Sequence, residues 1–323
     1  MHNGAVSFPD TGTLVARLRA AGCVFAEDEA ALLLHATSDP DLLESLVAQR
    51  IAGFPLEHLL GWSEFRGLRV TVAPGVFVPR QRTVFLVDQA VELGRALGTA
   101  LQRSGATAGL MGASGAISAG IHYGGVDPAV QTSAEHTGPE GDTVRSPAPP
   151  PRAVVAVDMC CGCGALGLAF AKELAAEGVR VELTAADIEP AAVKCARENL
   201  EAVGGRVFEG DLFEAVPAEL RGRVDVLLAN TPYVPSGEIA GMPPEARDHE
   251  PRRALDGGVD GLDVLRRIAA VAGEWLAPGG HLLVEESEEQ APVAVEVMRS
   301  HGLIARVAEC EELGATVVIG TRG

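Results

Sequence analysis

The sequence is poor in aromatic residues, which make up 4% of its 323 residues and include two Trp and two Tyr. A base-stacking surface of the RNA-recognition type is therefore not expected. Basic residues are also scarce, because 26 Lys and Arg stand against 44 Asp and Glu, for a formal net charge of −18. This balance argues against tight, nonspecific binding to nucleic-acid phosphates. The 47% hydrophobic content predicts a globular protein with an aliphatic core.

Long apolar runs, a secretory signal and paired cysteines are lacking as well. No window of about 18 apolar residues occurs, and the opening MHNGAVSFPD has no basic region before an apolar run. The run Cys160-Cys161-Gly162-Cys163 suits neither ordinary disulfides nor the paired arms of a zinc site. Asp248-His249-Glu250 offers no fourth ligand and is expected to be a loop contact. We therefore expect a cytoplasmic protein with reduced thiols, no membrane association and no metal.

The first third of the chain predicts helices followed by a hairpin. Apolar residues recur at helical spacing across 11–60, and Asp39-Pro40 is typical of a helix start. Across 62–72 the period becomes that of strands, with Arg66-Gly67 as the turn. A helix is expected to follow over 83–101.

A stretch of different composition follows at 104–152, where 32 of 49 residues are Gly, Pro, Ala, Ser or Thr. Its small apolar surface does not offset the entropy lost on ordering, which predicts a flexible insertion. The alternative is a lid that orders over a substrate.

From Ala153 the chain alternates apolar runs of strand length with helical patterns. This alternation predicts an α/β fold with a doubly wound, mostly parallel, Rossmann-like sheet. Ligands bind such sheets at the carboxyl ends of the strands. The last apolar runs, near 302–307 and 315–321, are expected to form an added antiparallel hairpin that closes the sheet. The charged run 285–289 is expected to be a solvated strand end and helix start.

The first strand of this region runs into a glycine-rich loop at 158–164, whose glycines let a ligand approach the backbone at a helix N-terminus. A nicotinamide dinucleotide and S-adenosylmethionine both suit this pattern, and a turn without ligand is the alternative. Asp158 favours S-adenosylmethionine, because a carboxylate opposes a pyrophosphate but tolerates an ammonium or sulfonium. The candidate ligand-binding residues of the loop are Asp158, Cys160, Cys161, Gly162, Cys163 and Gly164.

Acidic residues also end the next two strands. Asp187 is placed to accept both hydroxyls of a ribose, and an N-cap for the helix after Glu189 explains it equally well. Asp211 suits an adenine amino group while Leu212 or Phe213 packs on the ring. An N-cap is again the alternative.

The most specific feature is Asn230-Thr231-Pro232-Tyr233, which follows an apolar strand. A planar NH2 group is a poor nucleophile, and acceptors around its two N–H bonds orient it toward an electrophile. Asn230 offers a side-chain carbonyl, Thr231 a backbone carbonyl held extended by Pro232, and Tyr233 a flat wall. A plain turn is the structural alternative.

The chain resembles the protein-glutamine methyltransferases of peptide-chain release factors, including the branch labelled protein N5-glutamine methyltransferases. The resemblance covers most of the chain outside 104–152. It rests on Phe65-Arg-Gly-Leu-Arg-Val70, Val76-Phe-Val-Pro79-Arg80, 158–167, Asp187, Asp211-Leu-Phe213, Asn230-Thr-Pro-Tyr233 and 255–262. It implies S-adenosylmethionine as donor, a release factor as partner and the Gln of a Gly-Gly-Gln tripeptide as acceptor.

Three positions depart from the family pattern. Thr231 replaces the first Pro of Asn-Pro-Pro-Tyr, Cys160 replaces the first Gly of the glycine loop, and Arg82 stands where an acid is usual. Two alternatives therefore remain open. One is methylation of another planar nitrogen, on a nucleobase or a small molecule, and the other is a noncatalytic homologue that binds the donor.

The predicted organisation combines these elements. The domains are a helical substrate-recognition domain at 1–60, a hairpin and connecting helix at 61–103, the insertion at 104–152 and an S-adenosylmethionine-dependent methyltransferase domain at 153–323. The predicted catalytic residues are Asn230, Thr231, Pro232 and Tyr233. The predicted donor-binding residues are Asp158, Cys160, Cys161, Gly162, Cys163, Gly164, Asp187, Asp211, Leu212 and Asn230.

Overall fold

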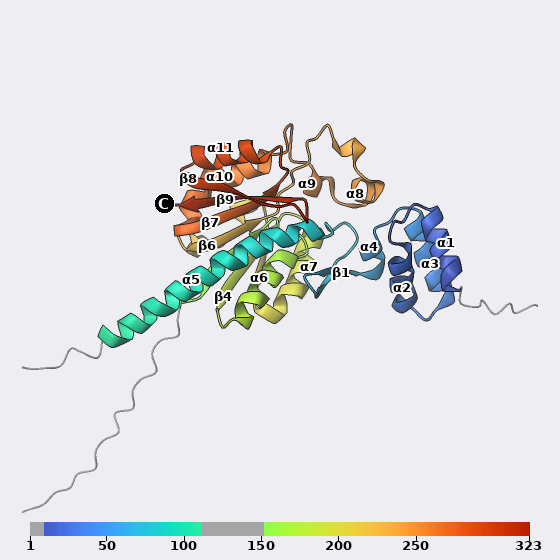
Figure 1. The fold of residues 1–323 in the computed structure, drawn as a ribbon, viewed down its shortest axis with the longest axis horizontal. Helices are drawn as coiled ribbons and strands as arrows, with labels where there is room; N and C mark the ends of the chain where they lie inside the picture. The colour runs from blue at the N-terminus through green and yellow to red at the C-terminus, as the bar shows by residue number, and fades with distance from the viewer. Residues whose placement is uncertain (1–9, 112–151) are drawn as a thin grey trace, which may run out of the picture.

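The computed structural model of the chain describes residues 10–111 and 152–323 (Figure 1). Its largest element is a seven-stranded sheet with the strand order β5-β4-β3-β6-β7-β9-β8. The strands are β3 (Val154–Met159), β4 (Val181–Asp187), β5 (Arg206–Glu209), β6 (Val224–Ala229), β7 (Leu276–Glu286), β8 (Leu303–Cys310) and β9 (Ala315–Arg322). Neighbouring strands are parallel except β9, which is antiparallel to β7 and β8. The predicted α/β fold with its closing hairpin is confirmed.

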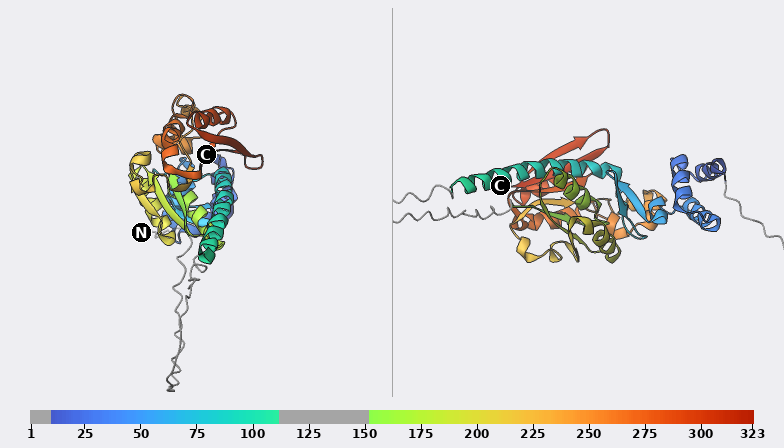
Figure 2. Two further views of the ribbon diagram at one scale, coloured as in Figure 1. Left: turned by 90° about the vertical axis from the view of Figure 1, so that its left-hand side faces the viewer. Right: turned by 90° about the horizontal axis from the view of Figure 1, so that it is seen from below.

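Helices cover both faces of the sheet, as Figure 2 shows. On one face α5 (Val84–Met111), α6 (Ala165–Ala176) and α7 (Pro190–Leu200) share a core with the sheet. On the other face the core is shared with α10 (Asp263–Trp275) and α11 (Ala291–Ser300). β3 and β6 lie between these layers and are buried along their whole length, which accounts for their nearly continuous apolar sequences.

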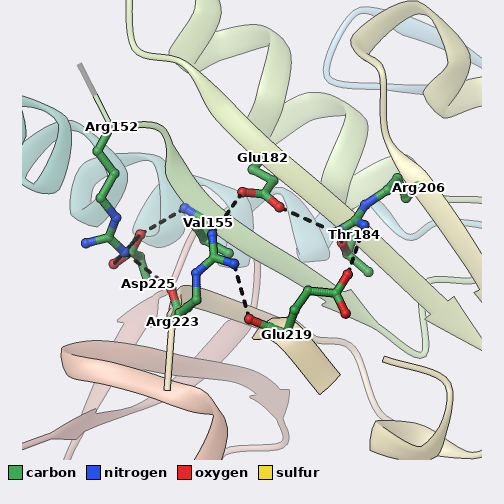
Figure 3. A network of polar contacts seen from close by, with 8 residues as sticks. All are labelled: Arg152, Val155, Glu182, Thr184, Arg206, Glu219, Arg223 and Asp225. Carbon is green, nitrogen blue, oxygen red and sulfur yellow. Dashed lines mark hydrogen bonds and ion pairs between the residues drawn. The ribbon is translucent and has the colours of Figure 1, made fainter. Parts of the chain in front are cut away.

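Asp225, the acid within β6, helps to hold the edge of the sheet at the amino ends of its strands (Figure 3). Its carboxylate accepts hydrogen bonds from the Val155 backbone N–H at 2.8 Å and from Arg152 at 3.0 Å. Arg206 lies in the same polar network and pairs with Glu182 at 3.4 Å. Asp225 is thus satisfied by structural contacts, far from the strand ends where ligands bind.

The strand order reverses at β3. The chain runs from β3 through β4 to β5 on one side and then returns to β6 on the other. The loops that follow β3 and β6 therefore diverge at the carboxyl edge of the sheet, which is the place where doubly wound sheets bind ligands.

The N-terminal helices form a bundle with a core of its own, at the far end of the molecule from the tip of α5 in Figure 1. The helices are α1 (Thr11–Ala20), α2 (Ala26–Ala36), α3 (Pro40–Ile51) and α4 (Leu56–Leu60). Asp39 caps α3 by accepting from the backbone N–H groups of Asp41 and Leu42, with Pro40 in the first turn. The helical N-terminal region expected from the sequence is present.

A hairpin links this bundle to the sheet. β1 (Trp62–Phe65) and β2 (Leu68–Thr71) pair across Arg66-Gly67, whose φ values of 54° and 69° are both positive. A two-residue turn with this geometry matches the twist of the strands. The Arg66 side chain binds Glu173 of α6 at 2.6 Å and thereby fastens the turn to the core.

Two parts of the structure differ from the sequence expectations. The helix expected over 83–101 continues to Met111 as α5, because adding a residue to an existing helix costs less than starting one. The rest of the expected insertion, 112–151, lies outside the described residues. The segment between β6 and α10 contains short helices that the sequence did not predict, α8 (Pro244–His249) and α9 (Arg252–Leu255).

Further short 3-10 turns join the main elements. They are η1 (Gln81–Thr83), η2 (Glu201–Val203), η3 (Leu212–Glu214), η4 (Ala218–Leu220) and η5 (Ile239–Gly241). In the part of the chain that is described, no helix is both long enough and apolar enough to cross a membrane.

Candidate active site

A cavity of about 420 Å³ opens at the carboxyl ends of β3, β4 and β6. This volume lies in the range of small-molecule sites. Every residue predicted for the site lines the cavity except Gly164. Those present are Asp158, Cys160, Cys161, Gly162, Cys163, Asp187, Asp211, Leu212, Asn230, Thr231, Pro232 and Tyr233.

Gly164 serves the packing of two helices instead. It is the N-cap of α6 with φ +79°, in the left-handed region that favours glycine. A Cβ atom there would lie 3.2 Å from the side chains of Ala196 and Leu200 on α7. Gly164 therefore lets α6 and α7 approach each other, and the structure does not place it against the cavity.

The loop between β3 and α6 holds two residues with positive φ beside the cavity. Gly162 and Cys160 both have φ 54°, and only the first is a glycine. The Cys160 conformation is therefore strained by the Cβ atom that a glycine lacks. Burial strongly raises the thiol pKa values of Cys160, Cys161 and Cys163, so these are neutral, weakly reactive groups at pH 7.

Asp158 is buried at the end of β3 with one oxygen satisfied. Its Oδ2 accepts a hydrogen bond from the Gly167 backbone N–H at 2.8 Å, whereas Oδ1 has no partner among the described residues. Burial raises the pKa of the carboxyl to about 8. A cation or hydrogen-bond donor in the cavity would satisfy Oδ1 and favour the charged form.

Asp187 joins the end of β4 to the glycine loop. One carboxylate oxygen accepts from the Gly162 N–H at 2.8 Å and the other from the Glu189 N–H at 2.9 Å. The N-cap of α7 is Glu189, so Asp187 braces the turn before the helix and does not occupy the cap position itself. Each oxygen retains a lone pair for a ligand. Burial raises the pKa of this carboxyl as well.

Asp211 and Leu212 form the wall beyond β5. Asp211 accepts from Arg267 of α10 at 2.7 Å and does not use its side chain to cap the following turn. Leu212 has φ 48° and, like Cys160, is a non-glycine residue in the left-handed region that lines the cavity. Arg267 was not anticipated because it lies 56 positions from its partner.

Asn230-Thr231-Pro232-Tyr233 follows β6 on the opposite wall of the cavity. The Asn230 side-chain oxygen Oδ1 is buried and has no partner among the described residues, and the same holds for the Thr231 hydroxyl. A buried carbonyl without a donor is costly, so an N–H group from a ligand would be favoured there.

The Tyr233 ring is held by two side chains that the sequence reasoning did not place in the site. Arg82 donates to the Tyr233 hydroxyl, and its guanidinium lies 5.4 Å from the centre of the ring. The hydroxyl in turn donates to Glu285 at 3.5 Å. Burial raises the pKa of Tyr233 to about 12, and the nearby Glu285 carboxyl contributes to the rise. The phenol therefore stays neutral.

The expectation that 285–289 is solvated was wrong for its first two residues. β7 continues to Glu286 and lies between β6 and β9, so Glu285 and Glu286 are buried, at 2% and 4% exposure. Burial raises the pKa of Glu286 to about 9. The strongly apolar residues directly before the run could have indicated that the strand continues into it.

The backbone of the Asn230–Tyr233 loop is supported from behind by the 255–262 motif. A Cβ atom on Gly257 would lie 2.5 Å from the Pro232 carbonyl oxygen, and one on Gly261 would lie 2.2 Å from that of Tyr233. Gln290 donates to the same Tyr233 carbonyl at 2.8 Å. The glycines are thus needed for close backbone contact, a role that their presence in the motif did not reveal.

The three residues 248–250 have separate partners, but they do not form the expected loop, because Asp248 and His249 are the last two residues of α8. Asp248 pairs with Arg247, and the His249 ring packs 4.1 Å from that of Phe54. Glu250 is buried and binds Arg80 at 2.6 Å. Within the described residues, no group of three or more His, Cys, Asp or Glu side chains is arranged to hold a metal ion.

Known proteins are similar in sequence to this chain over most of its length. A release factor glutamine methyltransferase of Streptomyces coelicolor (strain ATCC BAA-471 / A3(2) / M145) is 32% identical over 260 residues, which cover 80% of this chain and 72% of the relative. The chain belongs to the release factor glutamine methyltransferase family. The methyltransferase small domain family also matches, at residues 147–241. The predicted family and methyltransferase activity are thereby confirmed.

Two further relatives also match most of this chain. The release factor glutamine methyltransferase of Mycolicibacterium smegmatis (strain ATCC 700084 / mc(2)155) is 32% identical over 88% of this chain and 82% of its own length. A 4-amino-L-phenylalanine/4-methylamino-L-phenylalanine methyltransferase of Streptomyces pristinaespiralis is 30% identical over 79% of this chain and 69% of its own. Similarity of this degree therefore includes enzymes with different named acceptors.

Proposed function

We propose that this methyltransferase binds S-adenosylmethionine in the cavity and methylates the side-chain amide of a protein glutamine, in the Gly-Gly-Gln of a release factor. The observation that carries the proposal is the buried, unpartnered Asn230 oxygen on the cavity wall, in a chain of this family. When bound, the donor supplies an electrophilic methyl group on a sulfonium.

The donor side of the cavity has groups suited to that molecule. The unpartnered Oδ1 of Asp158 would accept from the ammonium of its methionine part, and the turn from Cys160 to Cys163 would lie along its chain. Asp187 would accept the ribose hydroxyls, and Asp211 with Leu212 would contact the adenine. The fit rests on Oδ1 of Asp158, because a buried carboxyl oxygen without a donor favours a cationic or hydrogen-bond-donating ligand.

The acceptor side orients a planar nitrogen. The Asn230 Oδ1 and the Thr231 carbonyl would each accept one N–H of the amide, and the Tyr233 ring would stack on its plane. Pro232 keeps Thr231 extended, so the carbonyl remains available although Thr replaces Pro at this position. Fixing both N–H bonds directs the nitrogen toward the methyl group without any covalent intermediate.

A second acceptor class is an aromatic amine on a small molecule. The relative named for 4-amino-L-phenylalanine favours it, because an aniline nitrogen is also planar and would suit the same two acceptors. The aspartates on the donor side would bind S-adenosylmethionine in the same way with either acceptor. The two proposals therefore differ only in what approaches Tyr233.

The test is a methylation assay with methyl-labelled S-adenosylmethionine. Intact release factors are compared with versions whose Gly-Gly-Gln carries Gln→Ala, and a third reaction contains 4-amino-L-phenylalanine. Label that enters the factor and disappears with Gln→Ala supports the glutamine acceptor. Label in 4-amino-L-phenylalanine alone supports a small aromatic amine as the acceptor. Donor binding with no label in either reaction contradicts both.

A variant tests the assigned roles in the same assay. Asn230→Ala is expected to reduce turnover by about 100-fold or more, because an acceptor aimed at the reacting group is lost. Its dissociation constant for S-adenosylmethionine, measured by calorimetry, is expected to change little. Loss of donor binding in a folded variant would contradict the assignment of Asn230 to the acceptor.

A further inference from the structure

Three side chains form a closed triangle at the acceptor end of the cavity. Arg82 donates through Nη2 to the Tyr233 hydroxyl and through Nε to Glu285 at 3.1 Å. The Tyr233 hydroxyl donates to the same Glu285 oxygen at 3.5 Å. The corners come from three separate segments: the residues before α5, the loop after β6 and the end of β7.

Burial differs between the corners. The Glu285 side chain is 3% exposed and lies beneath the other two, whereas that of Arg82 is 46% exposed and lines the cavity together with Tyr233. Burial raises the pKa of Glu285, and the Arg82 guanidinium beside it opposes that rise by favouring the charged form. Glu285 therefore fixes the guanidinium, and the guanidinium fixes the hydroxyl.

We propose that Arg82 and Glu285 are positioning residues that set the plane of the Tyr233 ring at the acceptor nitrogen. The inference rests on the proposed function, in which that ring stacks on the planar acceptor. The second side-chain torsion of a tyrosine is broad, so packing alone leaves the tilt of the ring loosely defined. A hydroxyl held from two sides restricts that tilt, and a small error in the orientation of an acceptor group has a large effect on rate.

The identity of residue 82 supports this role. An acid at position 82 would lie beside the buried Glu285 and repel it. Arginine reverses the sign and provides a planar set of donors that reach both the carboxylate and the phenol. The structure thus gives a local reason for a departure that the sequence left unexplained.

The experiment is a double-mutant cycle of Arg82→Ala and Tyr233→Phe. Each single variant is expected to lower kcat about tenfold, with the donor dissociation constant unchanged. The double variant is expected to be no slower than either single variant, because both remove the same link. Arg82→Lys, which keeps a charged donor, is expected to recover part of the loss. Multiplied effects in the double variant, or no effect of Arg82→Ala, would overturn the proposal.

A spectroscopic measurement follows the ring without turnover. The sequence contains two tyrosines, so protein labelled with ¹³C at the tyrosine Cζ gives two resonances, and Tyr233→Phe identifies that of Tyr233. Arg82→Ala is expected to move this resonance and leave the other in place. An unmoved Tyr233 resonance would also overturn the proposal. This measurement does not require methylation of a release factor. It therefore distinguishes failure of the positioning proposal from failure of the proposed function.

A matched control comes from the same helix region. Arg95 of α5 is 50% exposed, close to the 46% of Arg82, and it pairs at 2.6 Å with a glutamate, Glu177, that is exposed and not buried as Glu285 is. It does not line the cavity. Arg95→Ala is expected to leave kcat and the Tyr233 resonance unchanged. A loss in this variant equal to that of Arg82→Ala would contradict a specific role for Arg82.

Discussion

Cys160 is held in a backbone conformation that favours glycine. Its φ of 54° lies where glycine is unstrained and where a β-branched residue is least tolerated. The family pattern has glycine here, so the cysteine adds a Cβ atom and a thiol without changing the path of the loop. Strain at such a position persists only because Asp187 and the neighbouring strands hold the loop in place.

Substitutions at Cys160 are expected to follow backbone preference. Cys160→Gly relieves the Cβ strain but increases the entropy of the unfolded chain, so the free energy of unfolding is expected to change by less than about 1 kcal/mol. Cys160→Val is expected to lower it by about 2 kcal/mol. Urea unfolding of the wild type and the two variants measures the order of their free energies of unfolding. A valine variant as stable as the glycine variant would contradict the strained conformation.

Asp158 makes stability depend on pH. Its folded-state pKa of about 8 lies above the ordinary value of 3.8, so the folded protein binds the proton more tightly than the unfolded chain does. The contribution to stability is fully present below pH 3.8 and is lost as the pH rises through 8. Between pH 5 and 8, without donor, the free energy of unfolding is expected to fall more steeply in the wild type than in Asp158→Asn. Equal slopes in the two proteins would show that Asp158 titrates normally.

At the scale of the element, the loop after β6 depends on the glycines behind it. Gly257→Ala places a Cβ atom 2.5 Å from the Pro232 carbonyl oxygen, so the loop has to move. We expect turnover to fall at least about tenfold while donor binding is retained, because only the acceptor wall is displaced.

The control for this substitution is another glycine. A Cβ atom on Gly273 of α10 would meet nothing within 4 Å, so Gly273→Ala is expected to preserve activity and to stabilise the protein by up to about 1 kcal/mol. Kinetics and urea unfolding of both variants provide the comparison. Full activity in Gly257→Ala would show that the loop tolerates displacement.

The elements themselves were largely predictable because they depend on local patterns. β6 was expected at 224–229 and occupies those residues, and Arg66-Gly67 is the turn of the expected hairpin. Features that depend on distant pairing were not predictable. Arg82 and Glu285 are 203 positions apart, and nothing near either one specifies the other.

Across the whole molecule, Arg50 joins the helical bundle to the segment that borders the cavity. It binds Glu29 of α2 and Glu245 of α8, each at 2.6 Å, and is itself buried. Arg50→Ala leaves the buried Glu29 without its charge partner, and we expect a loss of about 3 kcal/mol in the free energy of unfolding.

The milder variant Glu245→Gln separates the two contacts of Arg50. It keeps the pair between Arg50 and Glu29 and weakens only the half-exposed contact to α8, so a loss below about 1 kcal/mol is expected. Thermal and urea unfolding of both variants measure these values. Equal losses would show that the contact to α8, and not the buried pair, dominates.

The direction of α5 has a practical consequence for engineering the enzyme. The helix starts beside Arg82 at the cavity and runs for 28 residues, so it carries the chain about 40 Å away before it ends at Met111. The chain re-enters at β3 from the amino edge of the sheet, opposite the cavity. A fluorescent reporter or an affinity tag attached at the end of α5 or just before β3 would therefore join the protein at a point remote from the cavity. The same junction offers a place to divide the gene for a split-enzyme sensor, in which reassociation of the halves restores methyl transfer.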